Sequence, residues 1–126
     1  MSALKRVVGT TVVLAALGTI APAAAHHSFA MFDHSKNTTL QGVVQEFDWK
    51  NPHMFIKLLA PESAGASPVS WNLEGPSVNI LVRNGWYVGI LKPGEKIAVT
   101  MNPLKSGASG GSLTSVTISG KTLYVH

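Results

Sequence analysis

The chain has 126 residues, with 10 Lys plus Arg against 6 Asp plus Glu, and it contains no cysteine. Without a thiol it cannot form disulfides, thiolate metal sites, iron–sulfur clusters, covalently attached haem c or an acylated lipoprotein cysteine. A chain of this length forms one domain, whose stability has to come from its hydrophobic core.

The beginning of the chain has the three parts of a signal peptide. Lys5 and Arg6 precede an uncharged, mostly apolar run over residues 7–20, and small residues follow up to Ala25. We therefore expect residues 1–25 to be removed by cleavage after Ala25, which leaves a periplasmic or secreted protein. The apolar run is short for a bilayer span and no second run follows it, so we expect no stable membrane anchor after processing.

The predicted signal peptide also carries part of the positive charge. Removing its two basic residues lowers the number of Lys and Arg from 10 to 8, against 6 acidic residues. The mature chain is then close to neutral, which makes nucleic acid an unsuitable partner. Residues 26–38 form an N-terminal extension, and residues 39–126 form the folded domain.

From residue 39 onward, short apolar runs are separated by Gly, Pro, Asn and Ser, a pattern typical of β-strands and turns. The alternation is clearest where Val69, Trp71 and Leu73 are interleaved with polar residues. The predicted strands cover residues 39–49, 54–59, 69–74, 96–102 and 113–119, and a further strand ends the chain.

One short helix is predicted between the third and fourth strands. Pro76 suits a first helical turn, and Val78 and Leu81 have helical spacing. Asn84 and Gly85 then provide a stop. Three strands, a helix and two more strands is the order of the OB-fold, so we expect an all-β, OB-fold-like barrel of five to six strands. An up-and-down barrel or a sandwich is the alternative, because the number of strands does not fix their connectivity.

Several motifs occur in order along the mature chain. They are AHHSF (residues 25–29), GVVQEFDWKNPH (42–53), WNLEG (71–75), RNGW (83–86), LKPGE (91–95) and GSLTSVTISGKTL (111–123). With these motifs the chain resembles a family of small exported bacterial proteins known only as a domain of unknown function, number 6152. The resemblance implies export and a small β domain, and it implies no activity and no catalytic residues.

The histidine pair at the predicted cleavage site is the most concrete candidate for chemistry. If cleavage falls after Ala25, the α-amine and imidazole of His26 can chelate one metal ion, and Cu(II) suits such a nitrogen set best. If cleavage falls after Ala24, His27 is the third residue and suits a square-planar Cu(II) or Ni(II) site. A frayed terminus that binds copper only weakly is the competing interpretation.

A third histidine follows the first predicted strand. Pro52 ends that strand, and His53 then lies at the mouth of the predicted barrel. His53 is therefore a candidate metal ligand together with His26 and His27, and its alternative role is a hydrogen bond that fixes the turn. His34 is predicted to be a solvated residue or a local cap.

Four residues near the same turn form a predicted ligand surface. They are Trp49, Asn51, Phe55 and Trp86. Aromatic side chains next to a polar turn can bind an organic ligand, whereas the alternative is that they belong to the core.

The sequence contains no catalytic signature. No nucleophile elbow is present, and Glu46 and Asp48 lie two apart on one strand face, as expected of a solvated surface. We therefore expect an exported binding protein without enzymatic activity, with copper as its candidate ligand. The alternatives are a metal-free adaptor or small-molecule-binding module, and an accessory to a metal-dependent oxidoreductase. We expect its partner in the periplasm to be a protein or a small molecule.

Overall fold

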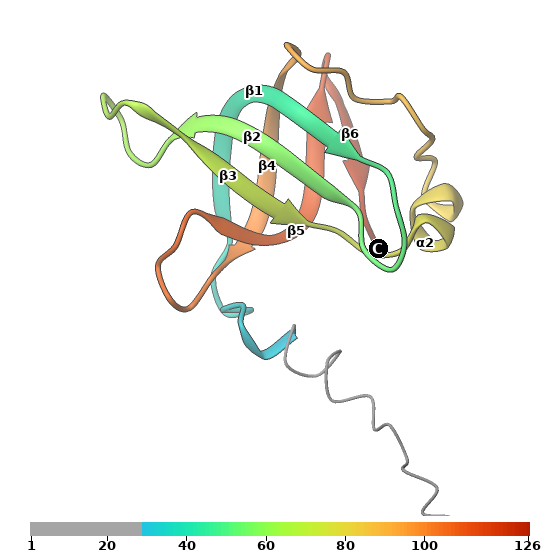
Figure 1. Ribbon diagram of the computed structural model, residues 1–126, viewed down its shortest axis with the longest axis horizontal. Helices are drawn as coiled ribbons and strands as arrows, with labels where there is room; N and C mark the ends of the chain where they lie inside the picture. The colour runs from blue at the N-terminus through green and yellow to red at the C-terminus, as the bar shows by residue number, and fades with distance from the viewer. Residues whose placement is uncertain (1–28) are drawn as a thin grey trace, which may run out of the picture.

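The structure is a computed structural model that describes residues 29–126 (Figure 1). The predicted signal peptide, together with His26 and His27, lies outside the described residues. Within the described part of the chain, no helix has the length and apolar character needed to cross a membrane.

Six strands and the short helix α2 follow one another in the order that the sequence predicts. They are β1 (Thr38–Asp48), β2 (Phe55–Pro61), β3 (Pro68–Glu74), α2 (Val78–Arg83), β4 (Lys96–Pro103), β5 (Gly110–Ile118) and β6 (Lys121–Tyr124).

The strands form one sheet in the order β3-β2-β1-β4-β5-β6, and a parallel pairing of β3 with β5 closes it into a barrel. The barrel therefore contains the first five strands, and β6 is an extra strand paired with β5. This connectivity, with α2 between β3 and β4, is that of the OB-fold. The prediction of an all-β, OB-fold-like barrel is confirmed, and the up-and-down and sandwich alternatives are not observed.

Alternation along β2 and β3 places every second side chain in the barrel interior. Ile56 and Leu58 of β2 are buried opposite Leu73 and Trp71 of β3. The Trp71 indole N–H donates to the Ala60 carbonyl at 3.1 Å. The indole of Trp71 is therefore buried with its N–H hydrogen-bonded. A buried N–H without a partner would destabilise the fold.

Strand β1 is long and bent because it pairs with two different strands, β4 along its first half and β2 along its second (Figure 1). The register shifts between Val44 and Glu46. At the shift, the backbone of Val44 forms hydrogen bonds with the turn before β4. Its N–H donates to the Glu95 carbonyl at 2.9 Å, and its carbonyl accepts from the Gly94 N–H at 2.8 Å. Such a bulge bends a strand, so that one continuous segment serves both sides of the barrel.

Strand β5 begins at Gly110, three residues before its predicted start. Its first residues pair with both β3 and β4. A Cβ atom at Gly111 would overlap the Met101 sulfur and lie 2.6 Å from the Asn102 carbonyl oxygen. Glycine at this position therefore lets three strands approach closely.

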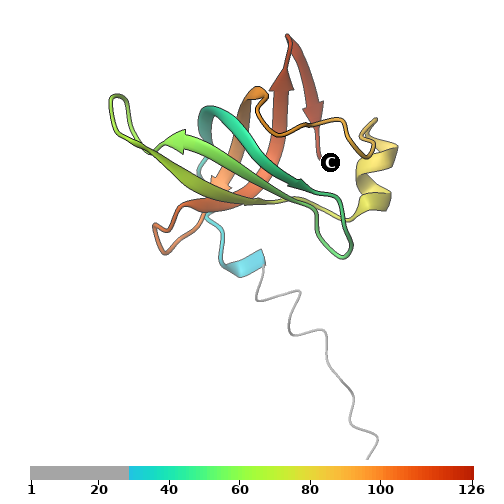
Figure 2. The same ribbon diagram turned by 45° about the horizontal axis from the view of Figure 1, so that its top comes forward.

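Trp86 follows α2 and belongs to the core. Its side chain is 2% exposed, and its indole N–H donates to the Tyr124 carbonyl at 2.8 Å. Nearby, the Asn84 side-chain amide donates to the Val125 carbonyl at 3.3 Å. Figures 1 and 2 both show the C-terminal end of the chain close to α2. The prediction that Trp86 contributes to a ligand surface is therefore wrong. The indole is buried, and its hydrogen bond connects the segment after α2 to β6.

We expect Trp86→Ala to lower the free energy of unfolding by about 3–5 kcal/mol, the range for removing a large buried aromatic side chain. Tyr87→Ala is the matched control, since the neighbouring ring is 60% exposed, and it should change stability by no more than about 0.5 kcal/mol. Urea unfolding followed by circular dichroism measures both. Equal losses in the two variants would contradict the core assignment of Trp86.

Candidate functional site

A pocket of about 210 Å³ opens at the end of the barrel where β3 finishes and β5 starts. We call it the histidine pocket. It is lined by Phe29, Phe32, His53, Glu74, Gly75, Pro76, Ser112, Leu113 and His126. A small number of polar groups among apolar ones is typical of a site that binds a ligand.

The strand pairings bring the polar residues of this pocket together. Glu74 pairs with Phe55 across β2 and β3, and it pairs with Ser112 across β3 and β5. The segment before β2 is then fixed by two backbone hydrogen bonds of Met54. Its N–H donates to the Pro76 carbonyl at 3.2 Å, and its carbonyl accepts from the Gly75 N–H at 2.8 Å. The barrel closure and these two bonds determine where His53 lies.

His53 presents one ring nitrogen to the protein. Its Nδ1 lies 3.2 Å from the Gly75 carbonyl oxygen and 3.3 Å from the Glu74 Oε1 atom. Both partners are acceptors, so Nδ1 carries the proton. In the neutral ring Nε2 then keeps its lone pair, which is the arrangement of a metal-ligating histidine oriented by a carboxylate. The alternative role predicted for His53, a hydrogen bond that fixes the turn, is compatible with the same geometry, because the two roles use different nitrogens.

Asn51 connects the loop between β1 and β2 to the helix. Its Oδ1 accepts from the Val78 N–H at 3.0 Å, whereas Ser77, at the N-cap position of α2, makes no side-chain capping bond. An Asn side chain from another segment therefore satisfies a free N–H at the start of the helix. The structure gives Asn51 a capping role.

The N-terminal extension packs onto the end of β4. Phe32 is buried and forms an isolated bridge with Leu104, and the Asp33 N–H donates to the Pro103 carbonyl at 2.8 Å. The Lys105 N–H donates to the Met31 carbonyl at 2.9 Å. These bonds bring Phe29 to the rim of the histidine pocket.

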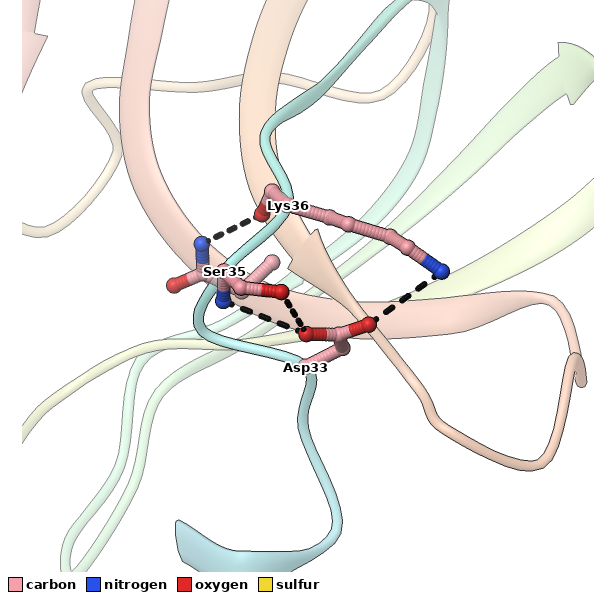
Figure 3. Close-up of polar contacts among 4 residues, drawn as sticks. Asp33, Ser35 and Lys36 are labelled. Carbon is pink, nitrogen blue, oxygen red and sulfur yellow. Dashed lines mark hydrogen bonds and ion pairs between the residues drawn. The ribbon is translucent and has the colours of Figure 1, made fainter.

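Asp33 organises the turn that follows this contact (Figure 3). Its Oδ1 accepts from the Ser35 hydroxyl at 2.6 Å and from the Ser35 N–H at 3.1 Å, and its Oδ2 lies 3.2 Å from the Lys36 ammonium. The hydrogen bond from the Ser35 hydroxyl, followed by that from Lys36, holds the pKa of the Asp33 carboxyl below its usual range. The turn is therefore built around an ionised aspartate.

The predicted ligand surface does not form a single patch. Trp86 is in the core, and Trp49 packs against the core with its ring 5.7 Å from that of Phe47. Phe55 lies in a separate groove of β1–β3, where the Lys50 ammonium is 5.4 Å from its ring centroid. Trp49 and Trp86 share Phe47 as a neighbour, whereas Asn51 bonds the helix and Phe55 lies in its own groove.

Sequence reasoning missed Glu74 and its relation to His53. The hairpin of β2 and β3 contains the signal that could have found it. Pairing Pro61 with Pro68, then counting backward along β2 and forward along β3, places Glu74 opposite Phe55, which is two residues after His53. Among residues 29–126, no three His, Cys, Asp or Glu side chains lie close enough to hold a metal ion.

The capping role of Asn51 can be tested by removing its side chain. Asn51→Ala should lower the free energy of unfolding by about 1 kcal/mol, because it leaves the Val78 N–H without its partner. Asn51→Asp keeps an acceptor oxygen at the same place and should retain most of the stability. Thermal unfolding of the two variants and the wild type measures this. Equal stability of the wild type and Asn51→Ala would rule out the capping role.

The Asp33 turn predicts a dependence on pH. We expect the Asp33 carboxyl to titrate in the folded protein below about pH 3.9, the ordinary value for aspartate. Because its pKa is lower in the folded state, it stabilises the fold above that pH, and this contribution is lost as the pH falls through the folded pKa. Carbon-13 NMR of the carboxyl measures the midpoint. Ser35→Ala should raise it, and an unchanged midpoint would show that the serine has no such effect.

Comparison with known protein families gives a match over most of the chain. The model of a family of unknown function (DUF6152) matches residues 13–114 of the chain. No curated protein and no solved structure matches it.

Proposed function

The chain belongs to the DUF6152 family of unknown function, and we propose that it is an exported binding protein that holds copper at the histidine pocket through His53, His26 and His27. The family supplies no activity, so the proposal is based on the residues of the pocket. It assigns the protein a binding role in the periplasm or outside the cell, without catalysis of its own.

The observation that supports this proposal is the environment of His53. Two acceptors hold Nδ1 at 3.2 and 3.3 Å, so that Nε2 remains for a ligand. The side chain is 42% exposed, whereas that of Glu74 is 17% exposed. The orienting carboxylate is thus more buried than the ring it orients, as expected when the outer nitrogen is the one that binds.

The remaining ligands in the proposal come from the predicted mature terminus. Phe29 lines the same pocket as His53. His27 is two residues before Phe29, and two extended residues span at most about 7 Å. Covalent geometry therefore allows a terminal histidine to reach a metal ion that is bound to His53.

Copper is the metal that this ligand set favours. An α-amine ordinarily titrates near pH 8 and an imidazole near pH 6.5, so both lose their protons at little cost when a metal binds at neutral pH. Nitrogen ligands bind Cu(II) more tightly than the other divalent first-row metals. Glu74 acts in this proposal by orienting His53 and not as a ligand.

Copper affinity of correctly processed protein tests the proposal. We expect the wild type, with a mass that shows His26 as its first residue, to bind Cu(II) at least about tenfold more tightly than the double variant His26→Ala, His53→Ala in competition with a chromophoric chelator. Glu74→Gln should weaken binding by about 10- to 100-fold, the usual effect of removing the carboxylate behind a ligating histidine.

Glu46→Gln is the matched control, because Glu46 pairs with Lys57 at 3.0 Å, away from the histidine pocket. It should bind copper as the wild type does. A double variant with wild-type affinity would eliminate the site. Turnover of dioxygen or peroxide by the copper-loaded protein would instead favour the oxidoreductase alternative.

A metal-free binding module is the second candidate, and the apolar part of the pocket favours it. Phe29, Phe32 and Leu113 provide a surface for a small organic ligand. Native mass spectrometry of protein purified from its own compartment separates the two candidates. A copurifying organic molecule without copper would support this second function and contradict the first.

A further inference from the structure

His34 joins the N-terminal extension to β4 through both of its ring nitrogens. Its Nδ1 lies 3.3 Å from the Asn102 Oδ1, and its Nε2 lies 3.0 Å from the Phe29 carbonyl oxygen. The imidazole also stacks on the Phe29 ring, with the centroids 4.0 Å apart, and meets the Phe32 ring edge-on at 6.3 Å. The side chain thus connects the segment that borders the histidine pocket to the barrel wall.

The orientation of the Asn102 amide is fixed by its other contacts. Its Nδ2 donates to the Lys36 carbonyl at 2.7 Å and lies 3.2 Å from the Asn37 Oδ1. Turning the amide over would place two oxygens 2.7 Å apart, without a proton between them. Asn102 is 9% exposed, so water does not readily replace these bonds. The atom that faces His34 is therefore an acceptor.

Both ring nitrogens of His34 consequently face acceptors. A neutral imidazole has one N–H and can satisfy only one of them, whereas an imidazolium has two and satisfies both. In the neutral ring, one nitrogen lone pair would point at either a carbonyl or an amide oxygen. The geometry is complementary to the charged form of His34.

We propose that His34 is a pH-sensitive clamp, which holds the Phe29–Asp33 segment against β4 when its ring is protonated and loosens it when the ring is neutral. The clamp does not depend on copper. Its consequence for metal binding rests on the proposed function, because Phe29 leads into the histidines that would bind the metal. In that case His34 is a positioning residue, which acts on the metal site through the Phe29–Asp33 segment.

Few other charged groups belong to the segments that contact His34. Asp33 and Lys36 lie on its own segment and pair with each other at 3.2 Å. Lys105 follows the end of β4 and reaches the segment through its backbone N–H. The β4 residue in contact, Asn102, is neutral. Between about pH 5 and 8 histidine is the ordinary side chain that titrates, so a change of the clamp in this range reports an imidazole.

Hydrogen exchange of metal-free protein tests the clamp at two amides. The Asp33 N–H donates to Pro103, and the Lys105 N–H donates to Met31, so both report whether the segment is docked. After correction for intrinsic exchange, we expect their protection to fall about tenfold between pH 5 and pH 8, because a hydrogen bond from a charged donor is lost. The Val44 N–H, which donates to Glu95, should keep its protection.

Two variants separate the clamp from His53, which lines the same pocket as Phe29. His34→Gln is neutral at every pH and should abolish the pH dependence at Asp33 and Lys105, whereas His53→Gln should leave it unchanged. Nitrogen-15 NMR of the wild-type ring provides a measurement that does not depend on a variant folding. Both His34 nitrogens should carry protons when the segment is docked, and one of them should lack its proton when the segment is released.

Several outcomes would overturn the clamp. A flat protection profile in the wild type, an unchanged profile in His34→Gln, or a ring with one protonated nitrogen while the segment is docked would each do so. The copper proposal fails by a different observation, namely equal affinity of the wild type and the His26→Ala, His53→Ala variant. The experiments can therefore show a working clamp in a protein without a specific copper site. They can equally show a copper site in a protein without the clamp.

Discussion

The parallel contact of β3 with β5 is the constraint on which the rest of the molecule depends. It closes the barrel, and it requires Gly110 and Gly111, because a Cβ at either position would meet Met101 or the backbone of a neighbouring strand. Closure also brings the end of β3 and the start of β5 to the same pole. The carboxylate of Glu74 and the backbone of Gly75 therefore lie at a fixed place beside Ser112, and this is where the histidine pocket forms.

The pocket and the N-terminal extension are built on this pole by different means. His53 is positioned by backbone bonds of its neighbour Met54 and by the acceptors at its Nδ1. The extension is positioned by the burial of Phe32 and by the bonds of His34. One histidine thus uses a single nitrogen to bond the protein, whereas the other uses two. This difference leaves His53 with a nitrogen for an external ligand and gives His34 a structural role.

Much of the fold can be predicted from the sequence, but less of the site. Alternation of Trp71 and Leu73 with polar residues predicts β3 because the period of a strand is local, and the position of α2 follows from Pro76 and Asn84 in the same way. The start of β5 and the burial of Trp86 depend on contacts with segments far away in the sequence, so the sequence misplaces the first and leaves the second as one of two alternatives. Glu74 was missed for a similar reason, since its contact with His53 exists only once the hairpin register is known.

The presence of Phe29 and His126 at one pocket has a practical consequence for work with recombinant protein. A polyhistidine tag fused after His126 would start at the pocket, and its imidazoles would compete with His53 for any metal ion. If the proposed mature protein begins at His26, a residual methionine or a tag before it would cover the amine that the copper proposal requires. The exposed loop between β2 and β3 is a better place for an affinity tag, since none of its residues lines the pocket.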